Sequence, residues 1–89
     1  MQTVRLTITG KVQGVFYRAG AKERAEELGL KGWVRNIAGG AVEITVSGDE
    51  ATIEEFTSWC RRGPSKARVE KVTRETISFE NFSDFRIIR

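Results

Sequence analysis

The 89-residue sequence contains no histidine and a single cysteine, Cys60. Without imidazole groups, catalysis by a histidine base is excluded, and a zinc, copper or iron site built from nitrogen and sulfur ligands is implausible. One cysteine cannot form a disulfide within the chain. Because no histidine is present to activate its thiol, Cys60 is expected to be a buried helix residue and not a nucleophile.

Long apolar runs are also missing. No segment approaches the roughly 20 apolar residues that a membrane-spanning helix needs, and residues 1–5 lack the basic start and apolar stretch of a signal peptide. We therefore expect a cytoplasmic protein that does not associate with membranes. The content of 39% hydrophobic and 30% charged residues, with one proline, is typical of a folded globular chain, and the length suits a single domain over residues 1–89.

The net charge of +3 is modest, and positive residues alternate with acidic ones along most of the chain. A small anion is therefore a better candidate partner than nucleic acid. One basic cluster stands out, formed by Arg61, Arg62, Lys66 and Arg68. Such a cluster is usually a solvated face, with steering of anions as the functional alternative.

The first half of the chain changes its hydrophobic period twice. Residues 3–9 alternate polar and apolar side chains, which predicts a half-buried strand. Residues 19–28 place apolar side chains at helical spacing, and Gly29 is positioned to end that helix. Residues 32–36 and 41–47 then predict two strands that form a hairpin.

The second half predicts another helix and two further strands. Ser47 and Glu50 have the spacing of a capping box, and Gly63 with the proline after it would end the helix. Residues 67–77 are strand-like with a break in alternation that indicates a bulge or a bend, and residues 85–88 predict a short last strand. The buried stripe of the helix is expected to contain Ile53, Phe56 and either Trp59 or Cys60, and the aromatic residues Trp33, Phe56, Trp59 and Phe85 are expected in the core or in an interface.

This order of elements is βαββαβ with a short extra strand. It predicts an α+β fold of the ferredoxin-like, split βαβ type, a sandwich in which two helices cover one face of an antiparallel sheet. No repeat, linker or low-complexity tract interrupts it.

The segment with the clearest chemical content is residues 10–18 (GKVQGVFYR), between the first strand and the first helix. Glycines allow a tight turn that can aim several backbone N–H groups at one point, and a helix N-terminus adds its positive dipole end. Arg18 would add a fork of donors that matches phosphate oxygens. On spacing alone, a simple turn followed by a surface arginine is equally consistent. The segment matches neither a P-loop nor a dinucleotide fingerprint.

Together with residues 32–36 (GWVRN), Gly40 and Gly48, this segment closely resembles the two signature motifs of the acylphosphatase family, and the resemblance covers essentially the whole chain. It implies hydrolysis of the carboxyl-phosphate bond of acylphosphates, with no metal or organic cofactor. The implied partners are a small acylphosphate substrate and inorganic phosphate or sulfate as product-like ligands, and the protein is expected to act as a monomer.

The resemblance also implies roles for individual residues. Arg18 would bind the phosphate together with the backbone amides of Val15, Phe16, Tyr17 and Arg18, and Asn36 would orient the attacking water. From its position alone, Asn36 could equally be a turn residue at the end of a strand. Two positions depart from the family pattern: Tyr17 replaces a more common phenylalanine, and Gly39 replaces an aspartate, which could loosen the turn beside Asn36.

Two other classes of function compete with this interpretation. RNA-binding modules share the order of elements, but they display aromatic residues on the central strands, and residues 41–47 contain none. A ligand-sensing domain that has kept the fold and lost turnover is the second alternative. The presence of both Arg18 and Asn36 argues against it.

Overall fold

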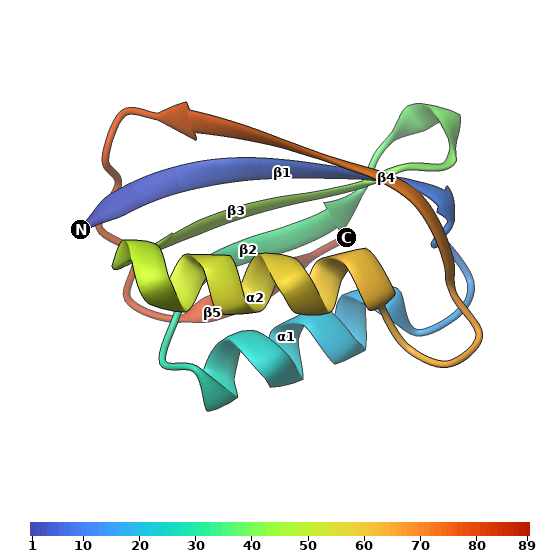
Figure 1. The fold of residues 1–89 in the computed structure, drawn as a ribbon, viewed down its shortest axis with the longest axis horizontal. Coiled ribbons are helices and arrows are strands. Elements are labelled where there is room, and N and C mark those ends of the chain that lie inside the picture. Colours follow the sequence, from blue (N-terminus) through green and yellow to red (C-terminus); the bar gives the residue numbers. More distant parts are fainter.

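The computed structural model describes all 89 residues. The elements in chain order are β1 (Gln2–Lys11), α1 (Tyr17–Glu27), β2 (Lys31–Asn36), the short 3-10 turn η1 (Ala38–Gly40), β3 (Val42–Gly48), α2 (Glu50–Arg62), β4 (Arg68–Ile77) and β5 (Phe85–Ile88). The expected βαββαβ order with a short extra strand is therefore confirmed, and both helices lie on one face of the sheet (Figure 1).

The sheet has the strand order β4-β1-β3-β2-β5. Strands β1 to β4 pair antiparallel as predicted, but β5 runs parallel to β2, so the complete sheet is mixed. The chain reaches that far edge because residues 78–84 cross the end of the sheet after β4. Two buried hydroxyls hold this crossing: Thr3 Oγ1 accepts a hydrogen bond from the Glu80 N–H at 2.8 Å, and Ser47 Oγ donates to the Glu80 carbonyl at 2.7 Å.

That contact explains why the predicted capping box of α2 is wrong. Ser47 lies in β3, and its hydroxyl is used by the crossing segment. The residue that caps α2 is Asp49, whose side chain accepts a hydrogen bond from the Thr52 N–H at 2.8 Å. Local spacing could not distinguish the two because both residues are good capping types.

The core forms where the alternating faces of β1 and β3 meet the helices. Leu6 pairs with Ile44 and Val4 with Val46, so a shared register places these side chains on the same face, and all four are fully buried. Burying one such side chain stabilises the fold by about 1.5–3 kcal/mol. The helices complete the core with Ala21 and Ala25 from α1 and with Ile53, Phe56 and Cys60 from α2.

The aromatic residues divide between the two faces of the sheet. Phe56 and Phe85 are buried in the core, and Trp59 packs against it. Trp33 lies outside the core on the open face, with the Arg35 guanidinium 5.0 Å from its ring centre. Of the two expectations for Trp33, the core is therefore wrong and an interface stays a prediction. Trp33 alternates with buried Val34, so the two side chains lie on opposite faces of the sheet, and Trp33 is half-buried.

The predicted bulge lies between β1 and β4. Thr9 pairs with Lys71 and Gly10 with Val69, which leaves Glu70 as the extra residue. A Cβ atom at Gly10 would lie 2.1 Å from the Arg68 carbonyl oxygen, so only glycine allows the two strands to approach this closely.

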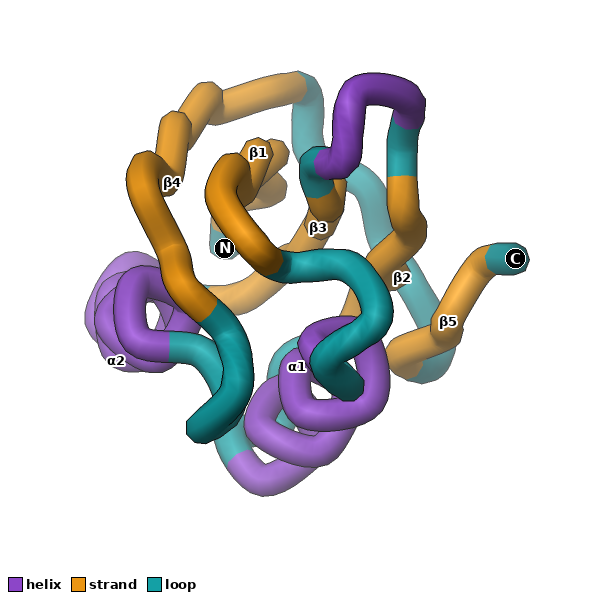
Figure 2. Tube along the Cα trace, turned by 90° about the vertical axis from the view of Figure 1, so that its right-hand side faces the viewer, coloured by secondary structure: helices purple, strands orange, loops and turns teal.

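Three connections gather at one end of the sheet. The turn after β1, the β2–β3 turn and the connection from α2 to β4 all lie on the right-hand side of Figure 1, where α1 begins, and Figure 2 views that end directly. Segments far apart in the chain therefore surround the start of α1.

Candidate active site

The turn between β1 and α1 contains two left-handed backbone positions. Gly14 has φ 75° and Phe16 has φ 64°, and Phe16 is the one non-glycine residue of the chain with positive φ. The left-handed region costs an ordinary L-residue about 1–2 kcal/mol. Strained backbone positions of this kind cluster at functional sites, where they hold the chain in the conformation that ligand binding needs.

This backbone leaves a row of donors free at the start of α1. No N–H group of residues 14–19 donates a hydrogen bond to another group of the protein. The helix has neither a side-chain cap nor an acidic residue in its first turn. The predicted phosphate-binding amides of Val15, Phe16, Tyr17 and Arg18 all belong to this row, which matches the requirements of an anion site.

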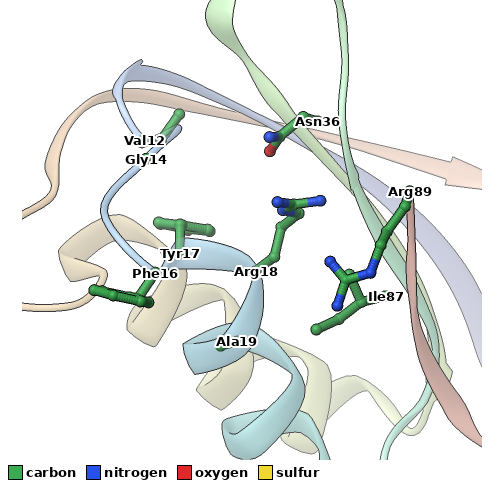
Figure 3. A pocket seen from close by; sticks show the side chains of 9 residues that line it. All are labelled: Val12, Gly14, Phe16, Tyr17, Arg18, Ala19, Asn36, Ile87 and Arg89. Atoms are coloured by element: carbon green, nitrogen blue, oxygen red, sulfur yellow. The ribbon is translucent and has the colours of Figure 1, made fainter.

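Arg18 is the second residue of α1 and projects from it into the space below Asn36 (Figure 3). Its guanidinium takes part in none of the ion pairs of the molecule. The five guanidinium N–H donors are therefore free for a ligand.

Asn36 is the last residue of β2, two positions after buried Val34, so its side chain shares the face that the helices cover. Figure 3 shows its amide directed toward the Arg18 guanidinium. The Asn36 Oδ1 atom is buried and has no hydrogen-bond partner in the protein. Because buried polar atoms are rarely left unpaired, this side chain has hydrogen-bonding capacity for a group that enters the site.

Val15 lines a different, second hollow. The other groups, from Phe16 to Ala19 together with Asn36, line one open hollow of about 400 Å³. Its lining residues are Val12, Gly14, Phe16, Tyr17, Arg18, Ala19, Asn36, Ile87 and Arg89. Two of them are arginines and none is acidic, so the hollow favours an anion. Arg89 was not predicted, since only the pairing of β5 with β2 brings it to this end of the sheet.

Tyr17 contributes its N–H to the site but directs its ring into the core. The buried hydroxyl donates to the Cys60 carbonyl at 2.7 Å, which ties the start of α1 to α2. Burial raises the pKa of Tyr17 above its ordinary value and raises the pKa of the Cys60 thiol to about 12. Cys60 is therefore a protonated core residue at neutral pH, as predicted.

Gln13 belongs to the first motif, and its side chain lies between the two turns. Its Nε2 donates to the carbonyls of Ile37, at 3.0 Å, and Ala41, at 2.8 Å. Gly39, predicted to loosen this turn, adopts φ 88° within it, and the turn is closed by a hydrogen bond from the Ile37 N–H to the Ala41 carbonyl at 2.9 Å.

The predicted basic cluster divides in the fold. Arg61 forms an ion pair with Glu54 at 3.7 Å. Lys66 and Arg68 instead line the second hollow together with Lys11, and Gly14 lines both hollows. Steering of anions by these side chains stays a prediction. No group of three or more His, Cys, Asp or Glu side chains is placed to hold a metal ion, and no helix has the length and apolar character to span a membrane.

Comparison with known proteins agrees with this geometry. The sequence profile of the acylphosphatase family matches residues 4–87. This chain belongs to the acylphosphatase family. It is 44% identical over 90 residues to an acylphosphatase of Methylococcus capsulatus, an alignment that covers 100% of this chain and 98% of the relative. The resemblance inferred from the two motifs is confirmed.

Solved structures of family members have the same fold. An acylphosphatase from Coxiella burnetii superposes with a TM-score of 0.94 at 42% identity, covering 98% of this chain and 92% of that one. The acylphosphatase from Bacillus subtilis gives a TM-score of 0.96 at 30% identity, with 100% of both chains covered. The protein is accordingly a hydrolase that acts on acid anhydrides, and its substrates are acylphosphates.

Proposed function

We propose that this protein hydrolyses the carboxyl-phosphate bond of small acylphosphates without a metal ion, with Arg18 and the amides of Val15, Phe16, Tyr17 and Arg18 holding the phosphate and Asn36 orienting the attacking water. The observation that carries the proposal is the convergence of unused hydrogen-bonding groups on one hollow. Residues 16–19 with their free N–H groups, the unpaired Arg18 guanidinium and the Asn36 side chain, whose buried Oδ1 has no partner, line it.

Phosphate binding follows from charge and shape. A helix N-terminus with no cap of its own places several N–H donors on one side of an anion, and its dipole adds positive potential. Arg18 extends from α1 toward Asn36, and its planar fork can pair two phosphate oxygens. Inorganic phosphate and sulfate present the same tetrahedral oxygens and should therefore compete with substrate.

The chemical step is an in-line displacement at phosphorus. The water oxygen forms a bond to phosphorus while the bond between phosphorus and the carboxyl oxygen breaks, and the electron pair leaves on the carboxylate. One water proton passes to a phosphate oxygen of the substrate. The products are a carboxylate and inorganic phosphate, so atoms and charge balance without a protein acid or base.

Positioning and electrostatic stabilisation supply the rate. A carboxylate is a good leaving group, and phosphoryl transfer depends mainly on orientation and on neutralising charge at the equatorial oxygens. Donors already held at the start of α1 need no reorganisation during the reaction. The hollow therefore needs neither the missing histidine nor an acidic lining residue.

Release of phosphate from benzoyl phosphate, measured with and without EDTA, tests reaction type and metal independence together. We expect the same turnover in both conditions, with competitive inhibition by inorganic phosphate. Turnover that EDTA abolishes and a divalent metal restores would overturn metal independence, and no phosphate release in either condition would overturn the activity.

We further propose that the protein works as a cytoplasmic monomer. The support for the monomer is that the fold of a single chain brings Arg18, Asn36 and the free N–H groups at the start of α1 to one hollow. Light scattering coupled to size-exclusion chromatography should give a mass near 10.0 kDa for the active species. An active dimer with no active monomer would contradict this proposal.

A further inference from the structure

The side chain of Gln13 is the hydrogen-bonded link between the two halves of the site. It lies in the phosphate-binding turn, one residue before Gly14, and its Nε2 reaches carbonyls on the opposite turn, at Ile37 and Ala41. Both N–H donors of the amide are used. No other side-chain hydrogen bond joins residues 10–18 to residues 36–41.

The link acts at the point where β2 and β3 separate. Asn36 pairs with Val42 as the last step of that ladder, and Ile37 follows Asn36 directly. The Ala41 carbonyl accepts from both the Ile37 N–H and Gln13, and the Ile37 carbonyl accepts from Gln13. The backbone immediately after Asn36 is therefore held to the phosphate-binding turn and not only to its own hairpin.

We infer that Gln13 is a positioning residue that fixes Asn36 relative to the bound phosphate. This inference rests on the proposed role of Asn36. An in-line attack tolerates little displacement of the water, since a misplacement of about 1 Å can cost on the order of 10²-fold in rate. Gln13 has the reach and the two donors that two facing carbonyls require, whereas glutamate at neutral pH has no donor and methionine has no hydrogen-bonding amide.

Gln13→Met is the first test because it keeps the length of the side chain and removes both donors. The matched control is Gln2→Met, at the opposite end of β1, where the side chain donates to Glu50. We expect Gln13→Met to lower kcat by roughly 10- to 100-fold, with inhibition by inorganic phosphate changed less than about threefold, and Gln2→Met to leave both unchanged. An unchanged kcat, or a phosphate affinity that falls as much as kcat, would overturn the inference.

A double-mutant cycle asks whether Gln13 acts through Asn36. If it does, Gln13→Met in the Asn36→Ala background should lower kcat no further than about threefold, because the positioned group is already gone. Multiplicative losses would show that Gln13 acts elsewhere and would overturn the assignment. The proposed function fails on different results: no phosphate release by the wild-type protein, or full turnover by Asn36→Ala alone.

Gln13→Glu supplies a readout that a purely structural role would not move. The introduced carboxyl group has no donor when ionised and gains one O–H donor when protonated. We expect its kcat, relative to wild type, to recover in part as pH falls toward about 4, near the ordinary pKa of glutamate, with no such recovery in Gln13→Met. Parallel pH profiles for the two variants would contradict the inference. If neither variant unfolds cooperatively, Gln13 serves stability and the assignment fails.

Discussion

The two helices begin in opposite ways. At the start of α2, Asp49 caps the Thr52 N–H and Glu50 stands in the first turn, where it pairs with Arg74 at 2.7 Å. At the start of α1 there is no cap and no acidic residue, and a left-handed Phe16 turns the chain into the helix.

Under the proposed function, the two helix starts serve different purposes. The capped end of α2 uses its own carboxylates to satisfy the N–H groups and the dipole, which favours stability. The start of α1 leaves the same kinds of donor unused and faces an arginine-lined hollow. A fold that satisfied both ends internally would be more stable and could not bind an anion there.

The largest effect on this contrast is expected from removing the positive charge of Arg18 at the uncapped start of α1. Arg18→Ala should lower turnover by about 10³-fold or more, as loss of a guanidinium does in other phosphoryl transfers, and should abolish inhibition by inorganic phosphate. Arg18→Lys should fail similarly because a point charge cannot copy the planar fork. Steady-state kinetics measure both, with Arg24→Ala in the last turn of the same helix as control. Unchanged phosphate inhibition would mean that the anion binds elsewhere.

Asn36→Ala tests the group opposite that helix start. We expect turnover to fall by roughly 10²- to 10³-fold, by analogy with the loss of one preorganised hydrogen-bonding group, while inorganic phosphate still binds. The same kinetics with a phosphate titration give both quantities. Asn81→Ala, in the segment between β4 and β5, is the matched control and should behave as wild type. Full turnover of Asn36→Ala would remove this residue from the mechanism.

Phe16→Gly tests whether the backbone at the uncapped start of α1 is strained. Its ring is 79% exposed, so little burial is lost, and glycine adopts φ 64° without steric cost. We expect the free energy of unfolding in urea to rise by about 1 kcal/mol. Phe79→Gly, at a 53% exposed residue without positive φ, should give no gain. A loss of stability in Phe16→Gly would show that the left-handed turn carries no strain.

The capped start of α2 should respond to pH in stability and not in activity. The hydrogen bond from Thr52 lowers the pKa of Asp49, so its stabilisation is present above the unfolded pKa of about 3.9 and is lost as pH falls through the lower folded pKa. Asp49→Asn keeps a capping oxygen and does not titrate. The Tm of wild type relative to this variant should therefore fall below about pH 4, with kcat near neutral pH equal in both. A difference in Tm between the two proteins that stays constant as pH falls through about 4 would contradict the proposed contribution of the ionised Asp49 cap.

Much of the site could be predicted because its parts are local. The alternation of Val4, Leu6 and Ile8 predicted the buried face of β1, and residues 10–18 contain the turn, the helix start and Arg18 in one continuous segment. Asn36 was found by its motif. The helix boundary differed, because the expected start at residue 19 lies two residues inside α1.

By itself, the sequence determined the periodicity of each element, the face that each would bury, and the run of residues able to surround a phosphate, since all of these depend on neighbours a few positions apart. Only the tertiary structure decided which distant segments would meet. The hydrogen bond from Gln13 to Ile37 joins residues 24 positions apart. Arg89 lines the hollow because β5 pairs with β2 at the far edge of the sheet. Ser47 does not cap α2 because its hydroxyl donates to the segment that crosses from β4 to β5. Such contacts follow from strand register and shared burial across the whole chain, which no local pattern encodes.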